Sequence, residues 1–108
     1  MKRVQKNDTS NWETLQIKEL KIDNRSHIVT IDGQLVNLSK LEYALLYYLL
    51  TNKGRVLTRY QILKAVWGND FYGDYRTVDT HIWRLRDKIK TSDVVISTVR
   101  GIGYRLEG

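Results

Sequence analysis

The sequence predicts an α+β domain in which a small N-terminal sheet is followed by three helices and a C-terminal β-hairpin. Three observations support this prediction. Residues 15–38 alternate apolar and polar side chains around a tight-turn dipeptide, residues 39–90 carry three apolar patterns at helical spacing, and residues 94–106 hold two strand-like runs separated by glycines. A chain of 108 residues that is 42% hydrophobic can build one core, so we expect one domain.

The N-terminal part is expected to form three or four short antiparallel strands. Apolar residues alternate from Leu15 to Ile22, a β-branched run covers 27–31, Asp32-Gly33 favours a tight turn, and Leu35, Val36 and Leu38 continue a strand. Residues 1–12 are polar and show no periodicity. We expect them to be a flexible leader or the tail of an interdomain linker, with the folded domain at 13–108.

Two helices are marked by capping boxes, in which a hydroxyl residue is followed three positions later by Glu or Gln. These pairs are Ser39 with Glu42 and Thr58 with Gln61. Apolar residues recur at helical spacing after each pair. Residues 52–54 and Gly68 are expected to end the two helices.

The third helix is predicted over 76–90, with Asp74 as its cap. Its two faces differ sharply in chemistry. The apolar stripe consists of Val78, Ile82, Leu85 and Ile89. The opposite face carries Arg76, Thr80, Trp83, Arg84 and Asp87, with Asp79 and Arg86 on one flank. One face is suited to a core, and the other can lie in the major groove of DNA.

The last segment predicts a hairpin with strands at 94–99 and 104–106 and a glycine-containing tip at 100–103. The order of sheet, helix, helix, loop, helix and hairpin is the layout of a winged helix-turn-helix. In that fold the third helix enters the major groove and the hairpin is the wing.

Charge favours a polyanionic partner. The chain has 18 Lys and Arg against 12 Asp and Glu, a net charge of +6, and four of those six charges fall within 76–105. There is no Cys, and the two His are isolated, so we expect no disulfide, no metal site and no cofactor. No serine has an evident base partner, so we do not expect an enzyme or catalytic residues. No apolar run approaches the ~20 residues of a membrane span, so a cytoplasmic protein is expected.

Four motifs together resemble a known family. They are LSKLEYALLYYLLTNKGRVLTRYQIL at 38–63, VWG at 66–68, RTVDTHIWRLRDKI at 76–89 and ISTVRGIGYRL at 96–106. In order and spacing they resemble the DNA-binding effector domain of OmpR/PhoB-type response regulators. The resemblance implies a four-stranded N-terminal sheet, three helices and a wing. It also implies control of transcription at promoter DNA, head-to-tail pairing of two copies on DNA, contact with RNA polymerase, and a receiver domain upstream.

Arg84 is the main candidate for reading bases, because its planar fork matches guanine O6 and N7, and the family's motif has a base-contacting Arg there. Arg76 and Thr77, at the helix N-terminus, are candidate phosphate contacts, although Thr77 can instead act only as a local cap. Asp79 can accept from a cytosine amine, or pair with Arg76 or hold Arg86 in position. Thr80 and Arg86 complete the candidate contacts of this helix.

Trp83 departs from the resemblance, since the family commonly has a basic residue there. An exposed Trp can contact a thymine methyl group, pack over a sugar of the DNA backbone, or pack against another protomer. In the wing, Arg100 is expected in the minor groove. The resemblance also implies that Thr98 and Trp67 contact phosphates, while simple core packing is the alternative for Trp67.

The loop at 68–75 has two interpretations. By resemblance it contacts RNA polymerase, and the candidate residues are Asn69, Asp70, Tyr72 and Asp74. Alternatively it is a surface connection whose aromatics Phe71 and Tyr75 fold onto the core. The sequence thus predicts specific binding of double-stranded DNA, the alternative being a winged-helix module that binds an acidic protein and has only non-specific affinity for DNA.

Overall fold

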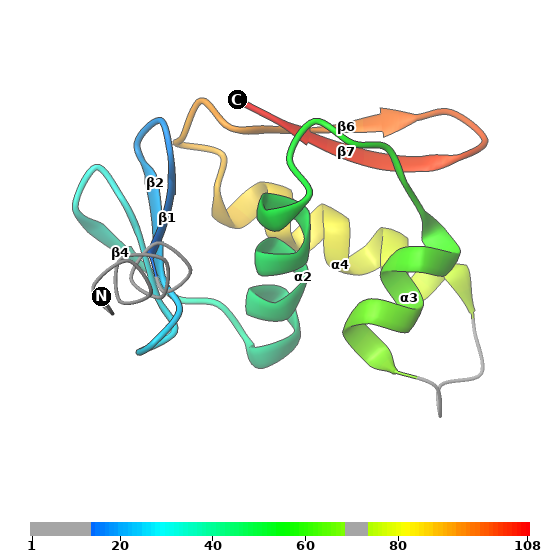
Figure 1. Cartoon of the computed structure of the whole chain (residues 1–108), viewed down its shortest axis with the longest axis horizontal. Coiled ribbons are helices and arrows are strands. Elements are labelled where there is room, and N and C mark those ends of the chain that lie inside the picture. Colours follow the sequence, from blue (N-terminus) through cyan, green and yellow to red (C-terminus); the bar gives the residue numbers. More distant parts are fainter. Residues whose placement is uncertain (1–13, 69–73) are drawn as a thin grey trace, which may run out of the picture.

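A computed structural model describes residues 14–68 and 74–108 (Figure 1). Within these ranges the chain forms two antiparallel sheets and three helices. The elements are β1 (Thr14–Ile17), β2 (Leu20–Asp23), β3 (Ile28–Ile31), β4 (Gln34–Val36), α2 (Lys40–Thr51), β5 (Leu57–Thr58), α3 (Arg59–Trp67), α4 (Tyr75–Lys88), β6 (Val95–Val99) and β7 (Gly103–Glu107). The predicted α+β winged helix-turn-helix is confirmed. The predicted leader at 1–12 lies outside the described residues.

The N-terminal sheet has the strand order β1-β2-β3-β4. Its alternating side chains place Leu20, Ile22 and Val29 on the core side, where they are almost fully buried. Asp32 and Gly33 both have positive φ, and Ile31 pairs with Gln34, as in the two-residue turns that match strand twist. The fourth strand was expected to include Leu38, but it ends at Val36.

Both predicted capping boxes are present. The Ser39 Oγ accepts from the Glu42 amide at 3.1 Å, and the Glu42 carboxylate accepts from the Ser39 amide at 2.9 Å. The Thr58 and Gln61 pair repeats this at 3.0 and 2.8 Å. Gly68 ends α3 with φ of 90°, a conformation that favours glycine. These local signals fix where α2 and α3 begin, and Gly68 fixes where α3 ends.

Helix α4 begins one residue earlier than predicted and ends at Lys88 rather than at residue 90. Asp74 is its cap, as expected, and accepts from the Arg76 amide at 2.9 Å. The apolar stripe packs into the core, with Val78, Ile82 and Leu85 fully buried. The expectation that Tyr75 folds onto the core, in the alternative of a plain surface connection, is wrong, because Tyr75 is exposed. Phe71, the other aromatic of that alternative, lies outside the described residues.

The wing belongs to a three-stranded sheet of order β5-β7-β6, and β5 was not predicted. Leu57 pairs with Tyr104, and Thr58 pairs with Gly103. A Cβ atom added at Gly103 would overlap the backbone of Leu57, so only glycine permits this approach. A two-residue strand is too short to show alternation, and for that reason the sequence pattern missed it.

The four-stranded sheet lies at one end of the molecule and α3 at the other, with α2 between them, and α4 runs lengthwise behind α2 to the end that holds α3 (Figure 1). The tip of the β6–β7 hairpin points toward the same end as α3 and the start of α4 (Figure 1). The sheet and helices thus leave the outer face of α4 and the wing tip free of the core. Within residues 14–68 and 74–108, no helix has the length and apolarity to cross a membrane.

Candidate nucleic-acid interface

The face of α4 opposite the core is exposed, as the sequence predicted. Arg76, Thr80, Trp83 and Arg84 all lie on it with exposed side chains. The Arg76 guanidinium reaches back to Asp74 at 3.4 Å, and Thr77 is half-buried beside it. Asp87 is exposed on the same face, which therefore offers one ring, two guanidinium groups, one hydroxyl and one carboxylate to a partner.

Asp79 lies on the flank of this face and is engaged within the fold. Its carboxylate accepts from Arg59 Nε at 2.9 Å and from the Tyr104 hydroxyl at 2.5 Å. The predicted pairing with Arg76 or Arg86 is wrong, because Arg59 reaches it from α3 instead. The cytosine contact stays a prediction.

The protonation of Tyr104 and Arg59 reflects this cluster. Burial raises the pKa of Tyr104, and the hydrogen bond to Asp79 and its negative charge raise it further. The hydrogen bond to Asp79 and its charge raise the pKa of Arg59 above its ordinary value. Both groups therefore stay protonated and hold the Asp79 carboxylate between α3, α4 and β7.

Arg86 joins α4 to the wing. Its Nε and Nη2 donate to the Ile96 carbonyl at 2.9 and 2.6 Å, and Nη2 also donates to Thr98 Oγ1 at 2.8 Å. The guanidinium lies 5.5 Å from the centre of the Tyr104 ring. Since the Thr98 hydroxyl accepts from Arg86, its own proton remains available for a phosphate oxygen.

Trp67, at the end of α3, combines features of both sequence interpretations. It is half-buried and packs against the core. Its ring meets the edge of His81 at 5.0 Å between centroids and 83° between planes. The Thr77 carbonyl lies 2.9 Å from His81 Nδ1, and because a carbonyl only accepts, that nitrogen carries the proton. Packing is thus confirmed, and the phosphate contact stays a prediction.

The wing tip is a tight turn closed by a hydrogen bond from the Ile102 amide to the Val99 carbonyl at 2.9 Å. Gly101, the third residue of the turn, has φ of 76°, as a type II turn requires. Arg100 is exposed beside it, as expected for a group that enters a groove. Ile102 is also exposed at this tip, and the sequence analysis did not single it out.

Of the predicted polymerase-contact residues, Asn69, Asp70 and Tyr72 lie outside the described residues. Asp74 is described, and its carboxylate caps α4. The Arg76 amide lowers the pKa of Asp74, and the Arg76 side chain lowers it further. Its role in capping is confirmed, and its contact with a polymerase stays a prediction.

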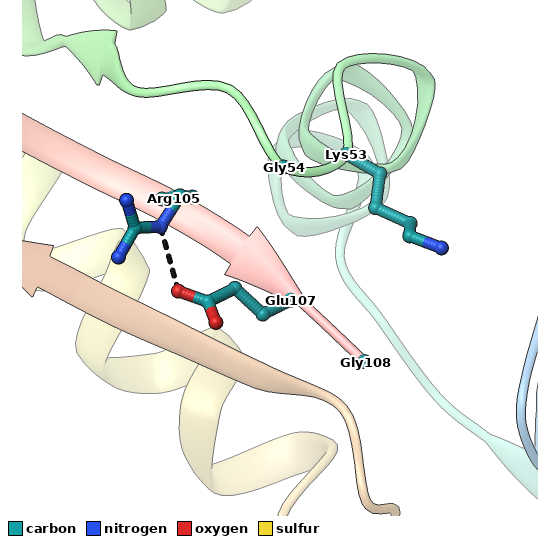
Figure 2. A pocket seen from close by; sticks show the side chains of 5 residues that line it. All are labelled: Lys53, Gly54, Arg105, Glu107 and Gly108. Atoms are coloured by element: carbon teal, nitrogen blue, oxygen red, sulfur yellow. Dashed lines mark hydrogen bonds and ion pairs between the residues drawn. The ribbon is translucent and has the colours of Figure 1, made fainter.

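The rest of the surface that the structure describes offers little for catalysis or metal binding. Across 14–68 and 74–108, no three His, Cys, Asp or Glu residues are grouped so that they could hold a metal ion. One pocket lies along β7 and is lined by Lys53, Gly54, Arg105, Glu107 and Gly108 (Figure 2). In it Glu107 pairs with Arg105 at 2.6 Å, and Lys53 points away from this pair (Figure 2). The carboxylate is already engaged, and the pocket brings together no nucleophile and base.

A sequence profile of the family described as "Transcriptional regulatory protein, C terminal" matches residues 33–106. The chain belongs to this family. Its members are transcriptional regulators, so the expectation that the chain is not an enzyme is confirmed. The transcriptional regulatory protein SrrA of Staphylococcus aureus is 44% identical over 108 residues, which cover 96% of this chain and 45% of SrrA. The chain thus spans less than half the length of this relative.

Solved structures agree with this membership. The DNA-binding domain of Klebsiella pneumoniae RstA, in complex with the RstA box, has a TM-score of 0.79 and 34% identity over 88% of this chain and 97% of RstA. Response regulator DrrB of Thermotoga maritima, an OmpR/PhoB homologue, has a TM-score of 0.83 and 31% identity over 99% of this chain and 50% of DrrB. The resemblance to OmpR/PhoB effector domains is confirmed.

In this effector domain, the structure adds two residues that the sequence analysis missed, Arg59 and the hydroxyl of Tyr104. Both converge on Asp79. Arg59 and Asp79 stand 20 positions apart on different helices, so no spacing rule within one helix connects them. Only the packing of α3 against α4 brings them together.

Proposed function

We propose that the chain binds double-stranded DNA in a sequence-specific manner, as the output domain of a two-component response regulator. In this proposal α4 lies in the major groove and the β6–β7 hairpin reaches the adjacent minor groove. The observation that carries it is the pairing of an exposed, arginine-bearing α4 face with an arginine-tipped wing. The RstA domain was solved with its box, and the DNA-binding domain of AdeR with an intercistronic region, which supports the same function here.

The exposed groups suit distinct contacts. The Arg84 guanidinium can donate two parallel hydrogen bonds to guanine O6 and N7. Arg76 and Thr77 lie in the first turn of α4, where the helix N-terminus favours phosphate, and Thr80 is exposed one turn further along. Arg100 suits the negative potential of a narrow minor groove.

Three further residues support the interface from its edges. Trp67 is a proposed phosphate contact at the end of α3, and its ring packs against the core and His81. Thr98 can donate its hydroxyl proton to a phosphate, because its hydroxyl oxygen only accepts in the hydrogen bond with Arg86. Arg86 then acts by fixing α4 to β6, and its charge still contributes to attraction of the phosphates.

The same proposal extends to the longer protein. A chain that covers 45% of SrrA leaves room for an upstream receiver domain. We propose that it acts in the cytoplasm on promoter DNA, with two copies bound head to tail. The candidate contacts with RNA polymerase are Asn69, Asp70, Tyr72 and Asp74 in the loop at 68–75. The other candidate, a winged-helix module for an acidic protein, shares the basic face but does not account for Arg100 at the wing tip.

The test begins with selection of bound DNA from a random pool, followed by titrations at several salt concentrations. Arg84→Ala is expected to weaken binding to the selected site by about 5- to 150-fold, the value of one bidentate base contact. Lys21→Ala is the matched control, since it also removes one exposed positive charge but lies on the outer face of the four-stranded sheet.

Equal losses for Arg84→Ala and Lys21→Ala would contradict the assigned face of α4. Tight binding to an acidic protein, with weak and sequence-indifferent DNA binding, would favour the protein-interaction module. Log affinity should also fall linearly with log salt concentration, since phosphate contacts release counterions.

A further inference from the structure

Trp83 is the most exposed large hydrophobic residue that the structure describes, at 69%. Within the described ranges it makes no hydrogen bond and no ring contact, whereas Trp67 packs against His81. A Trp left this far in water contributes little to the fold. It is a ready source of binding energy for a partner that buries it.

The position of Trp83 on α4 aims it at the groove rather than at the solvent beside it. At 3.6 residues per turn, Trp83 and Arg84 lie ~50° to either side of the outward line through Thr80 and Asp87. The two side chains therefore face opposite strands of a groove that α4 enters. Trp83 lies on the side of the wing, since the next two residues around on that flank, Asp79 and Arg86, contact β7 and β6.

The chemistry of the indole disfavours a phosphate against its ring. The face of an aromatic ring carries partial negative charge, so it does not attract an anion. The residues one turn before and one turn after Trp83, Asp79 and Asp87, add no unpaired positive charge there, because each is an acid that pairs with a cation of the fold. The indole also has no acceptor, so it cannot pair with an amine on a base edge. In the major groove, the apolar group that remains for it is the C5-methyl group of thymine.

We propose that Trp83 selects a thymine, by packing its indole against the C5-methyl group of that base. This rests on the proposed function and adds the class of base that Trp83 reads. Each half-site then contains one thymine chosen by apolar contact, on the strand opposite the guanine that Arg84 contacts.

The test uses the DNA selected with the wild-type chain, with each thymine replaced in turn by 2′-deoxyuridine, which lacks only the methyl group. Dissociation constants are measured by fluorescence anisotropy. At one thymine of the half-site the Kd should rise about fourfold, the effect of losing one buried methyl group. In Trp83→Ala this increase should disappear. Leu35→Ala is the control, because Leu35 is 63% exposed on the outer face of the four-stranded sheet, and it should keep the fourfold increase.

Two results would overturn the proposal while leaving DNA binding intact. Either no thymine responds to loss of its methyl group, or the response persists in Trp83→Ala, which would assign the methyl contact to another residue such as Thr80. Trp83→Ala could also lose affinity only on DNA that carries two half-sites, whether or not the thymine methyl groups are present. That result would overturn the proposal in favour of a contact between two copies. Failure of the proposed function would show earlier, in the wild-type chain. It would then bind the selected DNA no more tightly than scrambled DNA, even with every thymine in place.

Discussion

Asp79 offers a quantitative test of how α4 is held against α3 and the wing. Replacing it with Ala removes the acceptor of Arg59 Nε and of the Tyr104 hydroxyl. Hydrogen bonds to a charged group contribute about 1.5–3 kcal/mol, and an exposed ion pair about 0.2–1 kcal/mol. The Arg59 and Asp79 side chains are 39% and 35% exposed, which places the ion pair within the screened range. We expect Asp79→Ala to lower the free energy of unfolding by about 2 kcal/mol.

Asp79→Asn should cost about 1 kcal/mol, because its amide oxygen can still accept from Tyr104 while the charge facing Arg59 is lost. The assay is urea denaturation followed by circular dichroism, in which the midpoint falls while the slope stays constant. In a double-mutant cycle with Tyr104→Phe, the coupling energy should be about 1 kcal/mol.

Asp87→Ala is the matched control on the same helix. Its carboxylate pairs with Lys90 at the surface, where the two side chains are 61% and 70% exposed, so its loss should change stability by less than about 0.5 kcal/mol. The reasoning fails if Asp79→Ala is as mild as Asp87→Ala. It also fails if the cycle gives no coupling between Asp79 and Tyr104.

Two further predictions concern α2 and the wing. Burial raises the pKa of Glu42, but the Ser39 amide and the Lys88 ammonium lower it more, so the net pKa lies below its ordinary value of 4.5. A carboxylate whose pKa is lower in the folded state than in the unfolded state stabilises the fold at high pH. This stabilisation is lost as the pH falls through the pKa of the folded state. Glu42→Gln should therefore be less stable than the wild type at neutral pH. The gap should close below pH 4.5, and a gap in urea midpoints that stays constant with pH would contradict this. Gly103→Ala should lower the free energy of unfolding by about 1–3 kcal/mol, since its methyl group would overlap the Leu57 backbone, and an unchanged melting temperature would show that β5 and β7 separate freely.

Much of the fold was predictable because its signals are local. The Ser39 and Thr58 capping boxes, the Asp74 cap and the Asp32-Gly33 turn depend on residues within three positions of one another. The apolar stripe of α4 follows from helical periodicity alone. Even so, Leu35 shows the limit of hydrophobicity as a guide, since it was predicted within an apolar strand and lies exposed on an edge strand.

The candidate site was predictable only in part. Exposure of Arg84 and Trp83 follows from their angle to the buried stripe. The partners of Asp79 and Arg86 do not, because they come from α3, β6 and β7 and depend on how the elements pack. Spacing along α4 predicted Arg76 or Arg86 as the partner of Asp79, but the packing of α3 against α4 places Arg59 there instead.

The short strand β5 has a consequence for how the domain would meet DNA. It ends at Thr58, the cap of α3, and pairs with β7, so the helix-turn-helix and the wing are connected through a few backbone atoms. In the proposed complex, this link helps to set the distance between Arg84 on α4 and Arg100 at the wing tip. A binding site that does not match that distance would then require the double helix to bend or to narrow its groove. Base pairs between the two contact points would then affect affinity through their stiffness, without being touched by any side chain.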